Sequence, residues 1–296
     1  MSEIAWADRV GARVLRVGGV ELARYVTERD APPLESPRPY LHPMRTLGGS
    51  EVSGYRPDDH DWHWGLSIAI SNIDVPGEPL PVNLWGGVTF TGNDYEQLDN
   101  NGDQVHEGWD PDGAERLRWR TASGQPFLTE SRFLDASFIE VPGAPDAWRL
   151  DLSSRWTNIT DGTVHFGSPT TAGRENAGYG GLFLRAAPEF IAATVLSPAG
   201  PSDVDGAMGH PSPWLALATE TATVALAADP RNPVAESPFF VRTETPMLCA
   251  APFFFQKWAL GAGESAVWRW SLLVADGRLD ASTIAGALGV PGALGA

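Results

Sequence analysis

Residues 148–156 read WRLDLSSRW. Trp148, Leu150 and Leu152 alternate with polar residues, and successive side chains of a β-strand point to opposite faces. The stretch therefore predicts a strand with one apolar and one polar face. Residues 266–275 repeat the alternation, and the side chains on their apolar face are Trp268, Trp270, Leu272 and Val274. We expect Trp148, Trp268 and Trp270 to lie in the core.

Glycine and proline divide the rest of the chain into short segments, with 32 glycines and 25 prolines at close intervals. Gly18 and Gly19 separate two short apolar runs, which is the signal of a two-residue hairpin. Further candidate strands lie near residues 64–73, 82–91, 115–121, 127–140, 181–187, 213–219, 221–228 and 238–244. The best helix signal runs over 280–288, with Asp280 or Ser282 as N-cap and Gly289 after its end.

These signals together predict an all-β fold. Roughly a dozen or more strands at this spacing are typical of a large antiparallel β-sandwich, here with one short C-terminal helix. A galactose-mutarotase-like supersandwich is one form that such a fold could take. Because no linker or break in composition divides the chain, we expect residues 1–296 to form a single β-sandwich domain.

Composition excludes several classes of function. The net charge of −16 argues against binding to nucleic acid or to an anionic membrane, since both need a basic surface. No apolar run approaches the roughly 18 residues of a membrane helix, and the first residues lack the pattern of a signal peptide. A cytoplasmic protein is therefore expected. The single cysteine, Cys249, lies in an apolar run and is expected to be buried.

The segment at 38–45 reads RPYLHPMR and is the first candidate site. Its prolines favour an extended backbone, in which Arg38, Tyr40 and His42 share one face. A cation, a phenol and an imidazole on one surface suit an anionic or polyhydroxylated ligand. The alternative is an edge strand whose polar side chains face solvent.

The segment at 58–65 reads DDHDWHWG and is the second candidate. His60 and His63 could transfer protons or bind one metal ion from a turn. The alternative is that both rings pair with nearby carboxylates as structural contacts. The segment at 104–109 (QVHEGW) adds His106 as a weaker third candidate. The tryptophans expected to contact a ligand are Trp62, Trp64 and Trp85.

The motifs at 38–45, 59–65 (DHDWHWG), 83–87 (NLWGG) and 105–108 (VHEG) resemble the PmoA-like family, which carries the label "methane oxygenase PmoA". The runs GYGGLFLR at 178–185 and WRWSLLVADG at 268–277 are similar as well. A methane oxygenase in the membrane would need membrane helices, which the sequence lacks. The resemblance implies instead a β-sandwich protein of carbohydrate catabolism. The site residues that it implies are Arg38, His42, Arg45, His60, His63, Trp85, His106 and Arg185.

Three functions follow as hypotheses. The first is an enzyme that uses acid–base chemistry on a sugar or an oxidised sugar, as a mutarotase, epimerase or lyase does. Its catalytic residues would be His42, His60, His63 and His106, converging on one pocket, and its substrate-binding residues would be Arg38, Tyr40, Arg45, Trp62, Trp85 and Arg185. The second is a metal-dependent oxidoreductase with a divalent ion on His60, His63 and a carboxylate such as Asp59, Asp61 or Glu107. The third is a sugar-binding module without catalysis.

Overall fold

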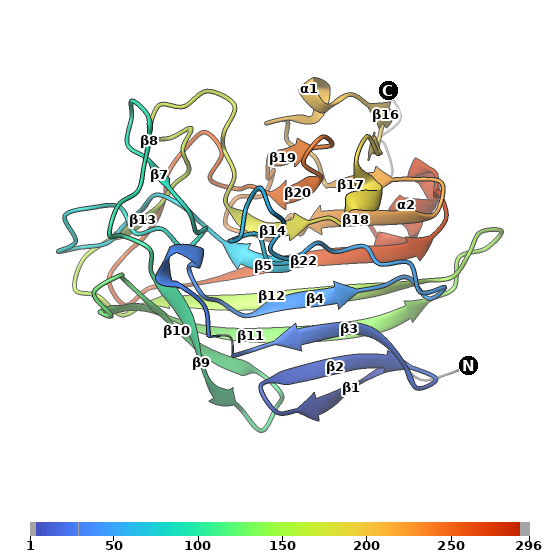
Figure 1. Ribbon diagram of the computed structural model, residues 1–296, viewed down its shortest axis with the longest axis horizontal. Coiled ribbons are helices and arrows are strands. Elements are labelled where there is room, and N and C mark those ends of the chain that lie inside the picture. Colours follow the sequence, from blue (N-terminus) through green and yellow to red (C-terminus); the bar gives the residue numbers. More distant parts are fainter. Residues whose placement is uncertain (1–3, 29, 291–296) are drawn as a thin grey trace.

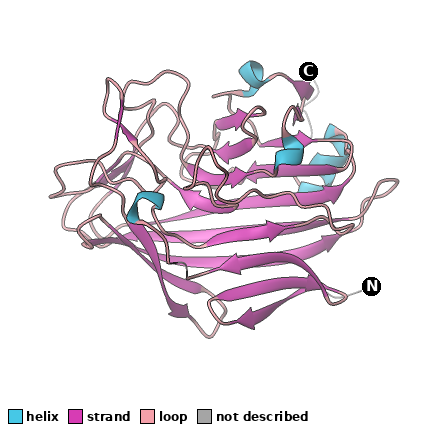
Figure 2. Cartoon of the chain, in the orientation of Figure 1, coloured by secondary structure: helices cyan, strands magenta, loops and turns pink. Residues whose placement is uncertain are grey.

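The computed structural model describes residues 4–28 and 30–290. Strands form the body of the molecule, and the helices are short (Figure 2). The predicted all-β fold is confirmed, and the two large sheets are antiparallel throughout.

The first large sheet has eight strands. In spatial order they are β1 (Ile4–Arg9), β2 (Ala12–Val17), β3 (Val20–Val26), β4 (Tyr40–Met44), β5 (Leu66–Ala69), β14 (Gly181–Arg185), β20 (Met247–Ala250) and β19 (Phe239–Arg242). The predicted hairpin joins β2 to β3 through Gly18 and Gly19, which have φ of 53° and 86°. Positive φ at both turn residues matches the twist of the flanking strands and favours glycine.

The second large sheet has nine strands. In spatial order they are β16 (Gly200–Ser202), β15 (Thr194–Ser197), β17 (Trp214–Ala218), β18 (Ala222–Ala228), β22 (Ser265–Asp276), β12 (Ala147–Asn158), β11 (Pro126–Ile139), β10 (Glu115–Arg120) and β9 (Asp103–Trp109). The alternating stretch at 148–156 lies in β12, which pairs along its length with β11 and β22. The smaller sheets contain β21 (Trp258–Leu260), β13 (Val164–Phe166), β6 (Ile73–Asp74), β7 (Thr89–Phe90) and β8 (Tyr95–Glu96).

The main core lies between the two large sheets, which overlie each other in Figure 1. Leu15 and Leu41 enter it from the eight-stranded sheet, and Trp148 and Trp268 enter it from the nine-stranded sheet. Trp148, Trp268 and Trp270 are all buried, as the alternation predicted.

The predicted C-terminal helix is α2 (Ala281–Leu288). The Asp280 side chain caps it by accepting a hydrogen bond from the backbone of Thr283 at 2.8 Å, and Gly289 ends it in the left-handed conformation. The helix packs on the outer face of the nine-stranded sheet. The short helices α1 (Val204–Ala207), η1 (Pro33–Glu35) and η2 (Pro188–Phe190) were not predicted.

One predicted strand needs correction, and some strands were not predicted. The strand near 82–91 is reduced to β7, because the Asn83 side chain accepts hydrogen bonds from the backbone of Trp85 and Gly86 and holds a turn there. Conversely, β1 at the start of the chain was not predicted. It pairs with β2 at the edge of the eight-stranded sheet.

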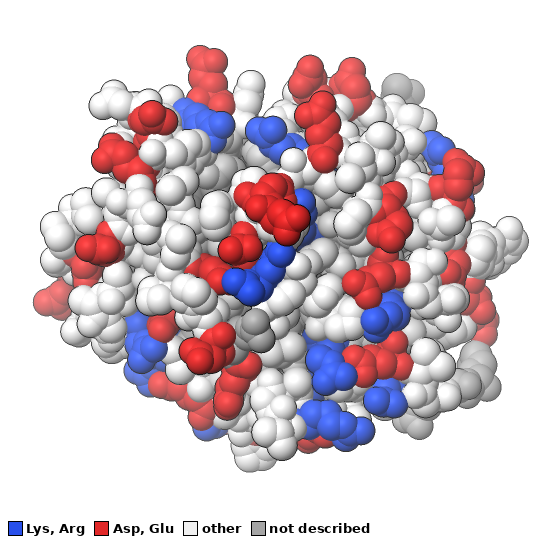
Figure 3. All heavy atoms as spheres, in the orientation of Figure 1, with Lys and Arg blue, Asp and Glu red and all other residues white. Residues whose placement is uncertain are grey.

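The surface agrees with the charge of the sequence. Acidic side chains are spread over the face drawn in Figure 3, and the basic ones on that face do not form a continuous area. Among the described residues, no helix has the length and apolar character to cross a bilayer.

The outer face of the eight-stranded sheet positions the candidate site. In β14, Leu182 and Leu184 enter the main core, whereas Phe183 lies in a separate apolar cluster on the other face. Phe240 of β19 belongs to the same outer cluster, and so does Cys249 of β20, which is buried as predicted. Loops from several parts of the chain cover this cluster.

Candidate functional site

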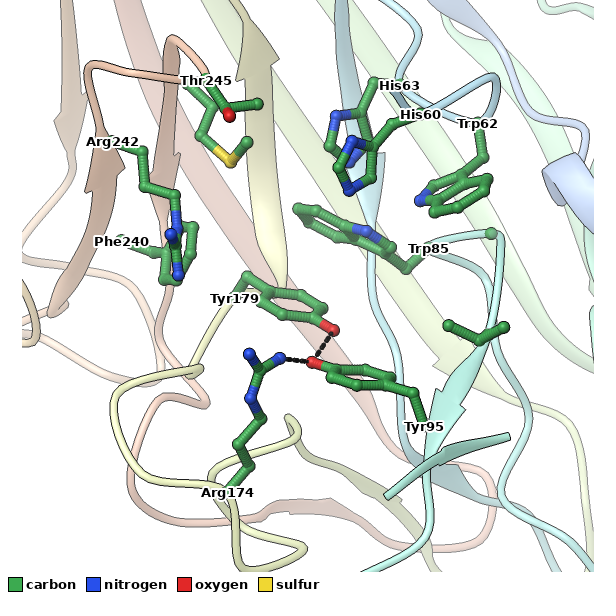
Figure 4. A pocket seen from close by; sticks show the side chains of 13 residues that line it. His60, Trp62, His63, Trp85, Tyr95, Arg174, Tyr179, Phe240, Arg242 and Thr245 are labelled. Atoms are coloured by element: carbon green, nitrogen blue, oxygen red, sulfur yellow. Dashed lines mark hydrogen bonds between the residues drawn. The ribbon is translucent and has the colours of Figure 1, made fainter. Parts of the chain in front are cut away.

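A pocket of about 390 Å³ opens over the outer cluster (Figure 4). We call it the aromatic pocket. Its lining residues are His60, Trp62, His63, Trp85, Gly86, Val88, Tyr95, Arg174, Tyr179, Phe240, Arg242, Thr245 and Met247. The volume lies within the range usual for small-molecule sites.

The floor of the aromatic pocket is built from packed rings. Trp85 is the centre of this floor, with its ring centroid 4.4 Å from that of Tyr179 and 4.5 Å from that of Phe183. Phe240 packs edge-on against Tyr179 at 5.5 Å. Trp85 and Phe240 are buried, so the floor is closely packed, and its rings offer an apolar surface to a ligand.

Two glycines and a buried arginine set the position of Trp62 at the rim. Gly86 and Gly87 have positive φ, and a Cβ on Gly87 would lie 2.4 Å from the indole of Trp62. The ring therefore packs directly on this glycine backbone. Arg38 donates to the Trp62 carbonyl at 2.8 Å and to Ser67 Oγ at 3.1 Å. Because Arg38 is itself buried, it supports the rim and does not line the aromatic pocket, contrary to its predicted role.

His60 is held by a carboxylate at the rim of the aromatic pocket. Its Nδ1 lies 2.8 Å from Asp59 Oδ2, and Arg185 donates to Asp59 Oδ1 at 3.1 Å. Burial raises the pKa of Asp59, but the hydrogen bonds from His60 and Arg185 outweigh it and leave that pKa below its ordinary value. An ionised Asp59 only accepts hydrogen bonds, so His60 Nδ1 carries the proton. In the neutral ring, Nε2 is then a free base.

His63 lies against His60, with parallel rings 4.4 Å apart. Arg185 Nη1 lies 3.1 Å from His63 Nδ1. A guanidinium only donates, so His63 Nδ1 accepts and its proton is on Nε2. Burial lowers the pKa of His63 well below its ordinary value, and the nearby His60 and Arg185 lower it further. The pair therefore combines a base, His60, with a hydrogen-bond donor, His63, whose lowered pKa favours the neutral ring.

Across the floor from the histidines lie two tyrosines and two arginines (Figure 4). The hydroxyls of Tyr95 and Tyr179 are 2.9 Å apart, and Arg174 donates to the Tyr95 hydroxyl. Burial raises the pKa of Tyr179 well above its ordinary value, with Arg174 and Arg242 acting in the opposite direction. Within the described part of the chain, neither arginine forms an ion pair, and Arg242 instead lies over the Phe240 ring.

The segment at 38–45 lies outside the aromatic pocket. The His42 ring stacks on Tyr55 at 5.2 Å, and Tyr40 stacks on the same ring at 5.1 Å. Tyr40 and His42, two of the three side chains predicted to share a face, therefore contact one ring, but Tyr40 is buried. Arg45 forms an ion pair with Glu51 at 3.0 Å. It does not line the aromatic pocket either.

His106 also lies elsewhere. It is on β9, where its Nδ1 lies 2.8 Å from Oε1 of the buried Glu115. The expected convergence of four histidines on one pocket is therefore wrong, and only His60 and His63 come together. Of the three tryptophans expected at the ligand, Trp62 and Trp85 line the aromatic pocket. Trp64 is fully buried and donates its Nε1 to Glu35 at 3.0 Å.

A metal ion on His60, His63 and Asp59 does not fit this geometry. The two imidazole planes differ by 9°, and stacked parallel rings do not direct their lone pairs to one point. Arg185 also donates hydrogen bonds to both His63 Nδ1 and Asp59, so these atoms are already engaged. Among the described residues, no three His, Cys, Asp or Glu side chains are grouped as metal ligands. Glu107, another carboxylate considered for this site, lies on β9 and pairs with Arg118.

Protonation of His42 should make stability depend on pH. Burial, with a smaller contribution from Arg45, lowers the pKa of His42 to about 4. In the unfolded chain, His42 has a pKa of about 6.5 and takes up the proton first, so this contribution to stability is complete above that pH and is lost as the pH falls toward 4. Because the ring is only half-buried, we expect His42 to account for about 1 kcal/mol of the loss in unfolding free energy between about pH 7 and pH 5.

Denaturant unfolding of His42→Gln at both pH values checks this expectation. The variant should lose less stability on acidification than the wild-type protein. His210→Gln, which removes an exposed histidine, should retain the wild-type dependence. An equal loss in the His42 variant would show that the ring is not held neutral.

Sequence reasoning missed the pocket residues Tyr95, Arg174, Tyr179, Phe240 and Arg242. One signal was present for two of them, because the run FFVR at 239–242 places Phe240 and Arg242 on one face of a strand. Tyr95 begins the two-residue strand β8 and Arg174 lies in a loop, so neither segment is long enough to show such a period. Their meeting depends on contacts between segments far apart in the sequence.

Comparisons with known proteins give a family but no activity. A model described as "Family of unknown function (DUF6807)" matches residues 12–288. The resemblance to the PmoA-like family is therefore wrong, since the matching family is a different one. No curated protein matches the chain.

The similarities to solved structures include two distant ones. One is to a polysaccharide lyase, with a TM-score of 0.40 and 12% identity over 84% of this chain and 32% of that one. Another is to heparinase III, with a TM-score of 0.35 and 9% identity over 94% of this chain and 37% of that one. The chain thus spans about a third of the length of each.

Proposed function

The chain belongs to the DUF6807 family of unknown function, and we propose that it binds an acidic sugar in the aromatic pocket and catalyses proton transfer at the carbon beside the acid group. The observation that carries this proposal is the position of His60. Asp59 holds its ring at the rim of an apolar floor. Across that floor are two arginines that form no ion pair within the described residues.

The floor suits the ring of a sugar. Flat aromatic surfaces such as Trp85 and Tyr179 pack against the apolar face of a ring, while polar groups at the rim reach its hydroxyls. Trp62 adds a half-buried indole at that rim. An aromatic floor with a polar rim is the arrangement expected for a small polyhydroxylated ligand.

The arginines favour a ligand with negative charge. The protein has a net charge of −16, yet Arg174 and Arg242 line the aromatic pocket without a carboxylate partner in the described chain. A guanidinium binds a carboxylate in a bidentate manner more readily than any other side chain does. A sugar carboxylate would therefore supply the negatively charged partner that Arg174 and Arg242 lack in the described chain.

The same groups could activate a carbon acid. An arginine on the carboxylate would stabilise the charge that develops there when the adjacent C–H bond breaks. Nε2 of His60 would take that proton, and His63 would donate from Nε2 to a ligand oxygen. Tyr95, hydrogen-bonded by Arg174, could then return a proton. Returned to the carbon, the proton gives an epimer; given to a departing oxygen, it gives an unsaturated product.

Calorimetric titration with uronic acids and the matching neutral hexoses tests the binding step. We expect a uronic acid to bind and Arg242→Gln to weaken it about tenfold or more, as loss of a charge-assisted hydrogen bond does. Arg155→Gln is the control, because it removes an exposed arginine outside the aromatic pocket. Equal affinity for acid and hexose, with no effect of Arg242→Gln, would contradict the proposal.

Proton exchange in D₂O, followed by NMR of the bound sugar, tests the chemical step. Deuterium should enter at the carbon beside the carboxylate, or an unsaturated product should form. Binding without either result would leave a sugar-binding protein and refute the catalytic half of the proposal.

A further inference from the structure

A second cavity of about 460 Å³ adjoins the aromatic pocket. We call it the second cavity. Its lining includes His42, Glu51, Tyr55 and Glu244. Thr245 lines both the second cavity and the aromatic pocket, so the two hollows meet at this residue.

Asp59 and Arg185 form the wall between the two hollows. Both line the second cavity. On the other side, Asp59 bonds to His60 and Arg185 bonds to His63, which line the aromatic pocket. The Asp59 side chain is 42% exposed, so this wall does not close over the opening. A ligand seated beside His60 therefore has a path across Asp59 and Thr245 into the second cavity.

The turn between β19 and β20 contributes an opposite charge to each hollow. Arg242 lines the aromatic pocket, and Glu244, two residues later, lines the second cavity. Both side chains are exposed, and neither forms an ion pair within the residues described. One short turn thus presents a cation to one end of a long ligand and an anion to the other.

The negative character of the second cavity rests mainly on Glu244. Glu51 and Asp59 also line it, but each pairs with an arginine, Glu51 with Arg45 and Asp59 with Arg185. His42, which also lines it, adds no positive charge near pH 7, because its pKa is lowered to about 4. Carboxylates accept hydrogen bonds from hydroxyl and amino groups and repel another carboxylate.

We propose that the second cavity is a subsite for the neighbouring unit of an oligosaccharide, and that it accepts a unit with hydroxyl or amino groups and excludes a second acidic unit. This inference rests on the proposed binding of an acidic sugar in the aromatic pocket. The substrate class is then a glycan in which an acidic sugar is linked to a non-acidic one.

Titration with three ligands of increasing size tests the subsite. The ligands are a uronic acid monosaccharide, the same uronic acid linked to a neutral sugar, and the same uronic acid linked to a second copy of itself, in galacturonate and glucuronate series. The mixed disaccharide should bind at least about tenfold more tightly than the monosaccharide, because its added ring makes new contacts. The acidic disaccharide should gain nothing.

Reversing the charge of Glu244, on the turn between β19 and β20, gives a second test of the subsite. Glu244→Lys should remove the preference for the mixed disaccharide and raise affinity for the acidic one, while affinity for the monosaccharide stays unchanged. Asp161→Lys makes the same charge change at an exposed position outside both hollows and should alter none of the three. Circular dichroism of both variants confirms that they are folded.

The outcomes distinguish failure of the proposed subsite from failure of the proposed function. If monosaccharide and mixed disaccharide bind equally, or if the wild-type protein binds the acidic disaccharide as tightly as the mixed one, the subsite is refuted and the proposed function stands. If no uronic acid of either series binds, the proposed function fails and the subsite fails with it.

Discussion

Replacement of His60 by glutamine is expected to lower the rate of proton transfer by about 10²–10⁴-fold, the usual contribution of a positioned general base. The amide of glutamine can accept a hydrogen bond but cannot hold a proton taken from carbon. His60 is 37% exposed and lies above the packed floor, so its loss should leave folding unchanged. Binding of the acidic sugar, which depends on the arginines and the floor, should also change little. The loss should therefore appear in kcat and not in KM.

Deuterium exchange into the sugar measures this loss. His210→Gln is the matched control, because it removes an exposed histidine outside the aromatic pocket. An exchange rate within about threefold of wild type (about 0.65 kcal/mol) in the His60 variant would exclude His60 as the base. Tyr95 would then be the remaining candidate.

Asp59 should act through His60 as a positioning residue. The Asp59→Asn side chain could offer either its oxygen or its amide N–H to His60 Nδ1, so the imidazole would no longer be fixed with Nε2 as the free base. A lower kcat at unchanged KM for the sugar is the expected signature. A merely structural role for Asp59 would instead change the melting temperature.

The sequence predicts the long strands of this fold well, and the reason is periodicity. Residues 148–156 and 266–272 alternate because one face of each strand packs in the main core and the other is less buried. Beyond them, Leu273 and Ala275 are buried on the outer face, where α2 packs. The N-cap at Asp280 was equally predictable from the sequence, because a helix N-cap is a local signal. The edge strand β1 lacks a comparable signal, since its residues are half-buried or exposed on both faces.

The candidate site was only partly predictable, because the chemistry of a histidine depends on its partners. His60 and His63 are close in sequence, so one turn brings them together. His42 points out of β4 toward Tyr55, and His106 points from β9 toward a buried glutamate on β10. No local pattern distinguishes these four environments. Arg242 joins the site only through the pairing of β19 with β20 and of β20 with β14.

His106 belongs to a charged network inside the main core, and this network gives the largest expected effect on stability. Arg132, on β11, is 1% exposed and binds Glu130 through two hydrogen bonds, of 2.6 and 2.9 Å. It also donates to the hydroxyl of Tyr25, on β3 of the facing sheet, at 2.8 Å. Burial alone would lower the pKa of Arg132, but Glu130, Tyr25 and Glu115 outweigh it and hold that pKa above its ordinary value. The guanidinium therefore stays charged and links the two sheets.

Arg132→Met is expected to destabilise the protein by about 3–5 kcal/mol, because it leaves a buried carboxylate without its cation. The exposed Arg155 lies on the neighbouring β12, opposite Ser131, and Arg155→Met should change the unfolding free energy by less than about 0.5 kcal/mol. Denaturant unfolding measures both. If the cause is the unpaired charge, adding Glu130→Gln to Arg132→Met should restore about 1 kcal/mol or more, because the amide stays neutral and still accepts from Trp119. If the double variant is less stable than the single one by the full cost of a second core mutation, the loss comes from packing and not from charge.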